Sequence, residues 1–307
     1  MTSTVRVPAK INLSLAVGPA RDDGYHSLAT VYQAVDLHDE VRATSRDDGR
    51  ITVTVHSEAP STGESDEVPV DDRNLAVRAA DLLRETMGVE EGVDLAIRKA
   101  IPVAGGMAGG SADAAAALVA CNAEWGLGMS RDELQELATR LGSDVPFLLH
   151  GGNAVGGGRG ELVSPVLARS RGSYHWVVAI AAVGLSTPAV FGEFDRLQDG
   201  ADVEEPRVPD DLLSALRAGD PAELGAALSN DLQAAALSLR PELQATLDLG
   251  RDAGALGAIV SGSGPTTVFL AGSEAEGLDI AFALAAAQVC ADVVQARGPV
   301  AGARLIT

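Results

Sequence analysis

Hydrophobic and polar residues alternate along several stretches with the period of two that is typical of half-buried strands. One such stretch runs from Val5 to Val17, with Pro8 interrupting it, and others cover 51–55 and 93–97. After residue 173, strand patterns alternate with helix patterns, which indicates an α+β or α/β fold. There we predict strands over 174–182, 258–260, 266–270 and 291–296, and helices over 188–197, 210–217, 222–228, 241–253 and 278–290.

Capping residues locate two helices in the first half of the chain. A helix is predicted over 75–87, with Asn74 among its candidate caps and Gly88 at its end. Residues 130–133 form a capping box that begins another helix, which Gly142 ends. The acidic segment before the first of these helices is poor in large apolar residues, so we expect a surface loop there.

Composition limits the classes of protein to which the chain can belong. A length of 307 residues with 46% hydrophobic content favours two globular domains, which we place at 1–165 and 166–307. The net charge of −20 argues against nucleic-acid or membrane partners held by a basic surface. Cys121 and Cys290 lie in apolar stretches, as expected of buried thiols in a reducing compartment, and no apolar run is long enough to span a bilayer. We therefore expect a cytoplasmic protein.

The stretch 102–113 has an unusual composition: two Gly-Gly pairs stand between a predicted strand and an alanine-rich helix. A helix start offers unpaired backbone N–H groups, and glycine lets an anion approach the backbone closely. The stretch lacks the lysine of a P-loop and misses the spacing of a dinucleotide fingerprint. It is either a tight turn that needs positive φ or a phosphate cradle, and Ser111 at the helix start favours the cradle.

Lysine is rare in this chain: of its 23 basic residues, only Lys10 and Lys99 are lysines. Lysine is a compact point charge, unlike the wide fork of arginine. Lys10 shares one face of its strand with Asn12, and this face is either solvated or part of a site. Lys99 is either an edge charge or an ATP contact. Asp144 follows a helix end in an apolar setting, where it is either a cap or a catalytic carboxylate.

The glycine stretch 102–112 resembles the second motif of the GHMP kinases, which bind ATP phosphates without a P-loop lysine. Residues 8–13, 142–147 and 261–265 resemble the branch of that family that acts on a cytidine-diphosphate-linked methylerythritol. The resemblance implies an α+β, two-domain GHMP kinase fold, with an N-terminal ribosomal-protein-S5-like domain and a C-terminal ferredoxin-like domain. It also implies ATP-dependent phosphorylation of the 2-hydroxyl of 4-diphosphocytidyl-2-C-methyl-D-erythritol in non-mevalonate isoprenoid biosynthesis, giving the 2-phosphate and ADP.

The resemblance also implies roles for individual residues. Lys10 and Asp144 would be catalytic, and Ser111 would bind Mg²⁺. The residues expected to bind ATP are Lys99, Pro102, Val103, Ala104, Gly105, Gly106, Met107, Ala108, Gly109, Gly110, Ser111 and Ala112. Those expected to bind the acceptor substrate are Asn12, Tyr25, His26, Asp144, Gly262 and Ser263.

Two other functions remain open at this point. Another GHMP kinase, acting on mevalonate, homoserine or a sugar, would share the glycine loop but would not need Tyr25 and His26. A non-catalytic nucleotide-binding module would have no reason to keep both Lys10 and Asp144. The expected partners are small-molecule substrates, and we expect a monomer or a weak homodimer.

Overall fold

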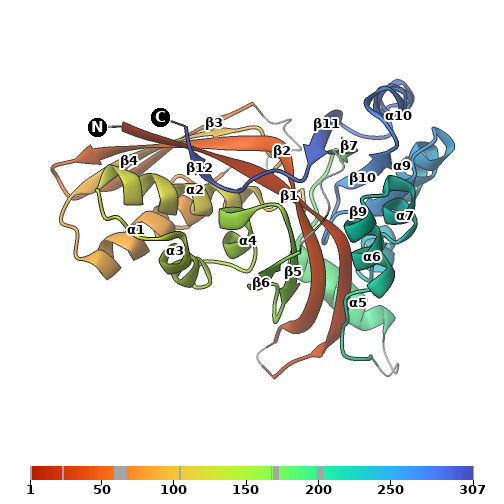
Figure 1. Ribbon diagram of the computed structural model, residues 1–307, viewed down its shortest axis with the longest axis horizontal. Helices are drawn as coiled ribbons and strands as arrows, with labels where there is room; N and C mark the ends of the chain where they lie inside the picture. The colour runs from red at the N-terminus through yellow and green to blue at the C-terminus, as the bar shows by residue number, and fades with distance from the viewer. Residues whose placement is uncertain are drawn as a thin grey trace.

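The computed structural model describes residues 2–22, 24–58, 68–103, 105–166, 168, 173–198 and 203–306. These residues form two sheets with helices packed against each (Figure 1). The strands are β1 Thr2–Ala20, β2 His26–Arg46, β3 Ile51–Ser57, β4 Gly92–Lys99, β5 Asn153–Gly157, β6 Leu162–Pro165, β7 Tyr174–Ile180, β8 Ser229–Asn230, β9 Gly257–Val260, β10 Thr267–Ala271, β11 Asp292–Gly298 and β12 Arg304–Leu305. The helices are α1 Leu75–Met87, α2 Gly109–Glu124, α3 Arg131–Ala138, α4 Val145–His150, α5 Thr187–Leu197, α6 Asp210–Ala218, α7 Pro221–Ala226, α8 Gln233–Leu239, α9 Glu242–Asp252 and α10 Glu274–Ala287.

The first sheet is built around two long strands, β1 and β2, in the order β12-β1-β2-β4-β3, with β5 on β2, β6 on β5 and β8 on β1. Helices α1 to α4 lie on one side of it, as Figure 1 shows. Helix α2 is the central one, and its alanines at 112 and 114–117 are fully buried. Small side chains let this helix lie close to the sheet, which sets the position of its first turn.

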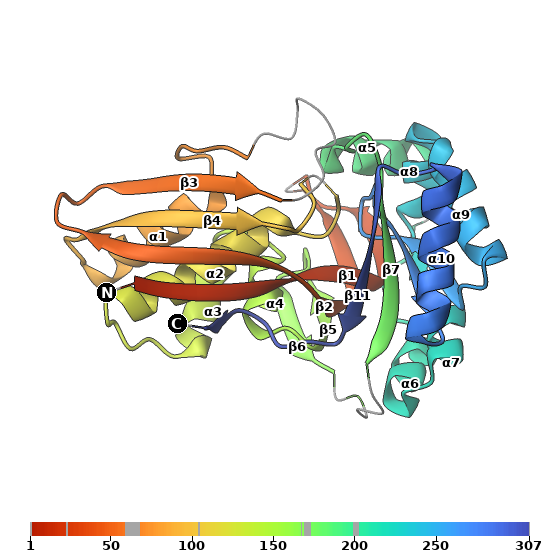
Figure 2. The same cartoon turned by 90° about the horizontal axis from the view of Figure 1, so that it is seen from above.

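The second sheet has the antiparallel order β11-β7-β10-β9, with helices α9 and α10 on its outer side (Figure 2). This is the ferredoxin-like arrangement that the resemblance implies. Side chains along β7 alternate between two cores. Val177 and Ala179 pack with the helices of this sheet, whereas Trp176, Val178 and Ile180 pack in the core that contains β1 and β2. The two sheets therefore share buried contacts along the length of β7.

Polar contacts reinforce this junction. The buried Gln33 of β2 accepts a hydrogen bond of 2.7 Å from the Trp176 indole and donates one of 2.7 Å to Asn153. Strands β8 and β12 come from the second half of the chain but pair with β1. The first sheet therefore takes two short strands from the second half of the chain, and the division at residue 166 stays a prediction.

Most predicted elements are present with small changes in their bounds. Helix α1 has Asn74 as its N-cap and Gly88 in the left-handed conformation after it, and the capping box at Ser130 begins α3. Strand β1 continues through Pro8, where its register against β2 shifts instead of breaking. The sequence analysis did not predict the short helices α4 and α8. Among the described residues, no helix combines the length and apolar character needed to cross a membrane.

We predict that Gln33→Leu will lower the free energy of unfolding by about 2–6 kcal/mol, because two buried polar groups lose their partner at about 1–3 kcal/mol each. Urea unfolding followed by circular dichroism measures the change. Gln244→Leu, on the exposed surface of α9, is the control and should change stability by no more than about 0.5 kcal/mol. Equal effects of the two substitutions would contradict a structural role for the Gln33 bridge.

Candidate functional site

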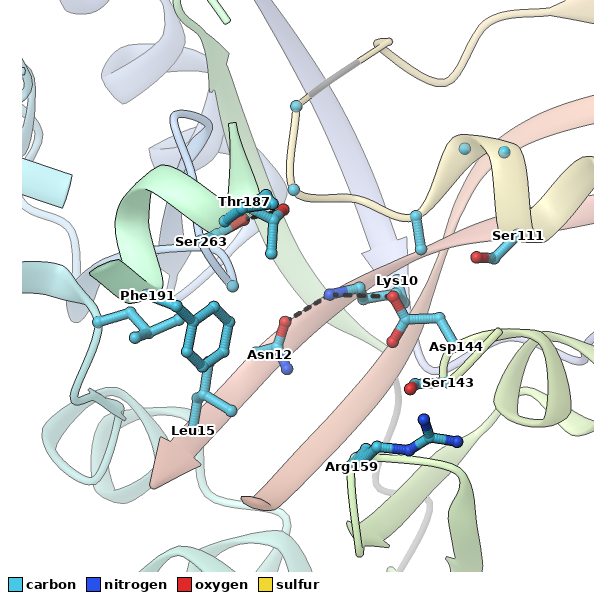
Figure 3. Close-up of a pocket in the computed structure, with 18 of the residues that line it drawn as sticks. Lys10, Asn12, Leu15, Ser111, Ser143, Asp144, Arg159, Thr187, Phe191 and Ser263 are labelled. Atoms are coloured by element: carbon cyan, nitrogen blue, oxygen red, sulfur yellow. Dashed lines mark hydrogen bonds and ion pairs between the residues drawn. The ribbon is translucent and has the colours of Figure 1, made fainter. Parts of the chain in front are cut away.

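A pocket of about 830 Å³ lies where the two halves of the molecule meet (Figure 3). Its walls come from β1, β2, the glycine loop, the first turn of α2, helix α5 and the turn 261–265. Residues predicted from four separate stretches of sequence therefore line one cavity. Lys10, Asn12, Tyr25, His26, Asp144, Gly262 and Ser263 are all among them.

One end of the pocket holds the predicted catalytic pair. The Lys10 Nζ donates a hydrogen bond of 2.7 Å to Asn12 Oδ1 and lies 3.9 Å from Asp144 Oδ2. Asn12 Nδ2 in turn donates to Thr30 Oγ1 at 2.8 Å. This chain of bonds holds the almost fully buried Lys10 ammonium in place beside the carboxylate.

Asp144 precedes helix α4 as its N-cap, yet its side chain makes no capping hydrogen bond. Its carboxylate is partly exposed and points toward Lys10 in the pocket (Figure 3). The Asp144 carboxylate is therefore not used to cap α4 and is available to take part in a reaction. The geometry does not support the capping role for Asp144, and the catalytic role stays a prediction.

Tyr32 supports this carboxylate and was not predicted from the sequence. Burial, followed by the charge of Asp144 and a hydrogen bond to it, raises the pKa of Tyr32 well above its usual value, so the phenol stays protonated as a donor. Its ring stacks on Phe147 of α4, with centroids 4.9 Å apart. Tyr32 lies beside Asn12 because the two residues pair across β1 and β2, a register that the sequence alone did not specify.

The glycines of the loop have different tasks. Gly106 has a φ of +73°, and a Cβ there would lie 2.4 Å from the Ser261 carbonyl oxygen, so it serves the tight turn. A Cβ on Gly109 would meet Ile101 inside the protein, at 3.3 Å. Gly110 has nothing nearer than 3.7 Å and lies on the pocket wall, where it leaves room for an anion. The turn interpretation therefore applies to Gly106, and the open space at Gly110 is compatible with the predicted phosphate cradle.

Not every predicted ATP-binding residue faces the pocket. The lining includes Pro102, Val103, Gly105, Gly106, Ala108, Gly109, Gly110 and Ser111. Met107 and Ala112 are fully buried in the core and are absent from this lining. Ala104 lies outside the described residues. Ser111 points its hydroxyl into the pocket (Figure 3).

Lys99 lines the pocket at one side and is otherwise enclosed by acidic side chains. Its side chain is 2% exposed, and its Nζ lies 2.5 Å from Asp39 Oδ2 and 2.7 Å from Asp113 Oδ2. Burial raises the pKa of Asp113, whereas the Lys99 ammonium lowers it. The ammonium is thus occupied by two carboxylates beneath the loop, while Lys99 still contributes to the pocket lining, so its contact with ATP stays a prediction.

The turn 261–265 lies over the catalytic pair. A Cβ on Gly262 would lie 3.1 Å from Asn12 Oδ1 and 3.3 Å from Lys10 Nζ. Asn230 holds the turn by donating to the Gly262 carbonyl at 2.8 Å, and the hydroxyls of Ser263 and Thr187 are 2.9 Å apart. The turn therefore closes the pocket beside the residues predicted to transfer the phosphoryl group.

The opposite end of the pocket is aromatic. His26 is buried, stacks on Phe191 with centroids 5.1 Å apart, and places Nε2 2.8 Å from Asp195 Oδ1. Tyr25 is half exposed, and the Arg159 guanidinium lies 4.9 Å from its ring centroid. Phe191 and Asp195 both lie on α5, far from His26 in sequence, and nothing in the sequence alone indicated that they meet.

Comparison with known proteins agrees with this geometry. Residues 74–152 match the GHMP kinase N-terminal domain and 212–289 the C-terminal domain. A 4-diphosphocytidyl-2-C-methyl-D-erythritol kinase of Salinispora tropica is 57% identical over 98% of this chain and 93% of its own, and one of Streptomyces coelicolor is 56% identical over the whole of both. The chain belongs to the 4-diphosphocytidyl-2-C-methyl-D-erythritol kinases, a branch of the GHMP kinases.

Solved structures support the same assignment. A crystal structure of 4-(cytidine 5'-diphospho)-2C-methyl-D-erythritol kinase matches at a TM-score of 0.72 and 31% identity, covering 95% of this chain and 98% of the other. A homoserine kinase from Cytophaga hutchinsonii matches at a TM-score of 0.75 and 21% identity, covering 99% and 97%. At that lower identity the second match establishes only the fold of a GHMP kinase.

We predict that Lys99→Met in this GHMP kinase will lower the free energy of unfolding by about 3–5 kcal/mol, because it leaves two buried carboxylates without their cation. Urea unfolding measures the loss. Arg98→Met, at the neighbouring residue, is the control. The Arg98 side chain is exposed and pairs with Glu58 on the surface, an interaction worth about 1 kcal/mol or less. Unchanged stability of Lys99→Met with weakened ATP binding would favour the direct ATP contact instead.

Proposed function

We propose that this GHMP kinase transfers the γ-phosphoryl group of ATP to the 2-hydroxyl of 4-diphosphocytidyl-2-C-methyl-D-erythritol, giving the 2-phosphate and ADP. One observation carries the proposal: a single pocket joins the Lys10–Asp144 pair, the glycine loop at the start of α2 and the aromatic end at His26. These are the parts that a phosphoryl donor, a reacting hydroxyl and a pyrimidine nucleotide would each require. The relatives of the same name support the choice of acceptor.

ATP would bind with its phosphates at the first turn of α2. Backbone N–H groups and the positive end of the helix dipole attract anions there, and Gly110 leaves the approach open. Mg²⁺ usually keeps several waters and takes one or two protein ligands beside the phosphates, where it offsets their charge. The Ser111 hydroxyl points into the pocket at the first turn of α2, so Ser111 is the residue that would hold Mg²⁺ beside the phosphates.

The acceptor hydroxyl would lie against Asp144, which takes its proton as the phosphoryl group is transferred. Phosphoryl transfer needs mainly positioning and charge stabilisation from the protein. The Lys10 ammonium, held by Asn12, would balance the negative charge between donor and acceptor. Tyr32 would hold the carboxylate from its other side.

The cytidine would occupy the aromatic end of the pocket. Tyr25 and Phe191 offer ring faces for stacking, and His26 offers a hydrogen-bonding edge. Arg159 also lines the pocket and extends toward Ser143 and Asp144, so it is placed to meet the diphosphate that links the base to the reacting alcohol (Figure 3). A cytoplasmic location and a monomeric or weakly dimeric state stay predictions.

We predict that ADP release will be fastest with the cytidine-linked acceptor. Free methylerythritol 4-phosphate should react about a hundredfold more slowly or worse, because the remote nucleotide helps to position the hydroxyl. A coupled assay against both compounds, with mevalonate, homoserine and galactose alongside, measures the preference. Faster turnover of any of the last three would assign the chain to another GHMP activity.

We further predict that Asp144→Asn and Lys10→Ala will each lower kcat by about two to four powers of ten, the usual contribution of a general base or a charge-stabilising group. The dissociation constant of ATP, measured by calorimetry, should change far less. Asp132→Asn, at the exposed start of α3, is the matched control and should leave kcat unchanged. Turnover close to normal in a folded variant would remove that residue from the mechanism.

A further inference from the structure

Three side chains of helix α5 surround His26, which lies at the start of β2 and faces this helix. Phe191 stacks on the imidazole at 5.1 Å, and Phe194 meets it edge to face at 6.0 Å. Asp195 Oδ1 lies 2.8 Å from Nε2 and the residue lines the pocket. The two halves of the molecule therefore fix both the plane of the ring and the partner of one ring nitrogen.

An ionised carboxylate can only accept hydrogen bonds, so Nε2 of His26 must carry a proton toward Asp195. In a neutral imidazole the other nitrogen, Nδ1, is then an acceptor. Without the carboxylate, the proton could reside on either nitrogen. As long as the imidazole is neutral, the Asp195 contact thus determines that Nδ1 of His26 offers an acceptor.

Cytosine and uracil differ at position 4 of the ring, and a hydrogen-bonding group such as Nδ1 of His26 can distinguish them there. Cytosine carries a 4-amino donor, whereas uracil carries a carbonyl acceptor at the same position. A fixed acceptor pairs with the amino group and is repelled by the carbonyl oxygen, and a buried polar group without a partner weakens binding.

We propose that Asp195 is a positioning residue that fixes His26 as an acceptor and thereby makes the pocket prefer cytosine nucleotides to uracil nucleotides. This inference rests on the proposed function, because it requires a pyrimidine nucleotide beside His26. It assigns to the second half of the chain a part in choosing the base.

The test compares CDP and UDP binding by calorimetry, with saturating ADP present to occupy the glycine loop. The wild type should bind CDP about tenfold more tightly than UDP or better, since one unmatched hydrogen bond accounts for such a factor. Asp195→Asn should reduce the ratio to about threefold or less, because an amide can donate or accept and so allows both states of His26. Its KM for the cytidine-linked acceptor should rise while the KM for ATP stays unchanged.

Two further variants separate this role from a structural one. Asp195→Glu keeps the carboxylate and should keep a clear CDP preference. Glu193→Gln is the control on the same helix, where Glu193 pairs with Arg196 and does not line the pocket, so the ratio should not change. If Asp195→Asn melts below the assay temperature, Asp195→Ala replaces it with the same expected ratio.

The outcomes distinguish this inference from the proposed function. A CDP preference that Asp195→Asn leaves intact, or equal loss in Asp195→Asn and Asp195→Glu, would overturn the role of Asp195 while the kinase assignment stands. Equal binding of CDP and UDP by the wild type would overturn it as well. If the wild type binds neither nucleotide and releases no ADP with the cytidine-linked acceptor, the proposed function itself fails.

Discussion

The buried ammonium of Lys99, held between Asp39 and Asp113, fixes the part of the molecule on which the site depends. Asp39 comes from β2, Lys99 from the end of β4 and Asp113 from α2. The other oxygen of Asp39 accepts hydrogen bonds from the amides of Ala100 and Ile101, at the point where the strand gives way to the glycine loop. One cation thus ties together the strand, the loop and the helix that follows it.

Such a cluster is a costly way to gain stability, because taking charges out of water offsets much of their mutual attraction. The cluster instead contributes by holding the strand, the loop and the helix in a fixed geometry. A hydrophobic replacement of the same volume could fill the space but could not bind two loop amides and a helix side chain at set distances. Since the expected anion contacts are backbone N–H groups, an error in loop position would misdirect all of them together. This triad of Lys99, Asp39 and Asp113 therefore acts on the site through the backbone that it holds in place.

The sequence predicted the parts of the structure whose causes are local. Asn74 and Ser130 cap the expected helices, and alternation located most of the strands, because both signals act within a few residues. The rarity of lysine identified Lys99 as important but not its role, since its partner Asp39 lies 60 residues away. Phe191 and Asp195 could not be identified for the same reason, since Asp195 lies 169 residues from its partner His26.

Net charge explains why the pocket is built as it is. A protein of net charge −20 repels both a nucleoside triphosphate and a diphosphate-linked acceptor. Of the cations that line the pocket, Lys99 is already paired with Asp39 and Asp113, Lys10 lies beside Asp144, and Arg159 lies over the Tyr25 ring. Fixed dipoles at the start of α2 supply attraction without adding a charge that would need its own counterion. The backbone N–H groups that carry these dipoles also cannot turn toward solvent, provided that the loop is held in place. The buried triad and the glycine loop are therefore two parts of one solution to anion binding in an acidic protein.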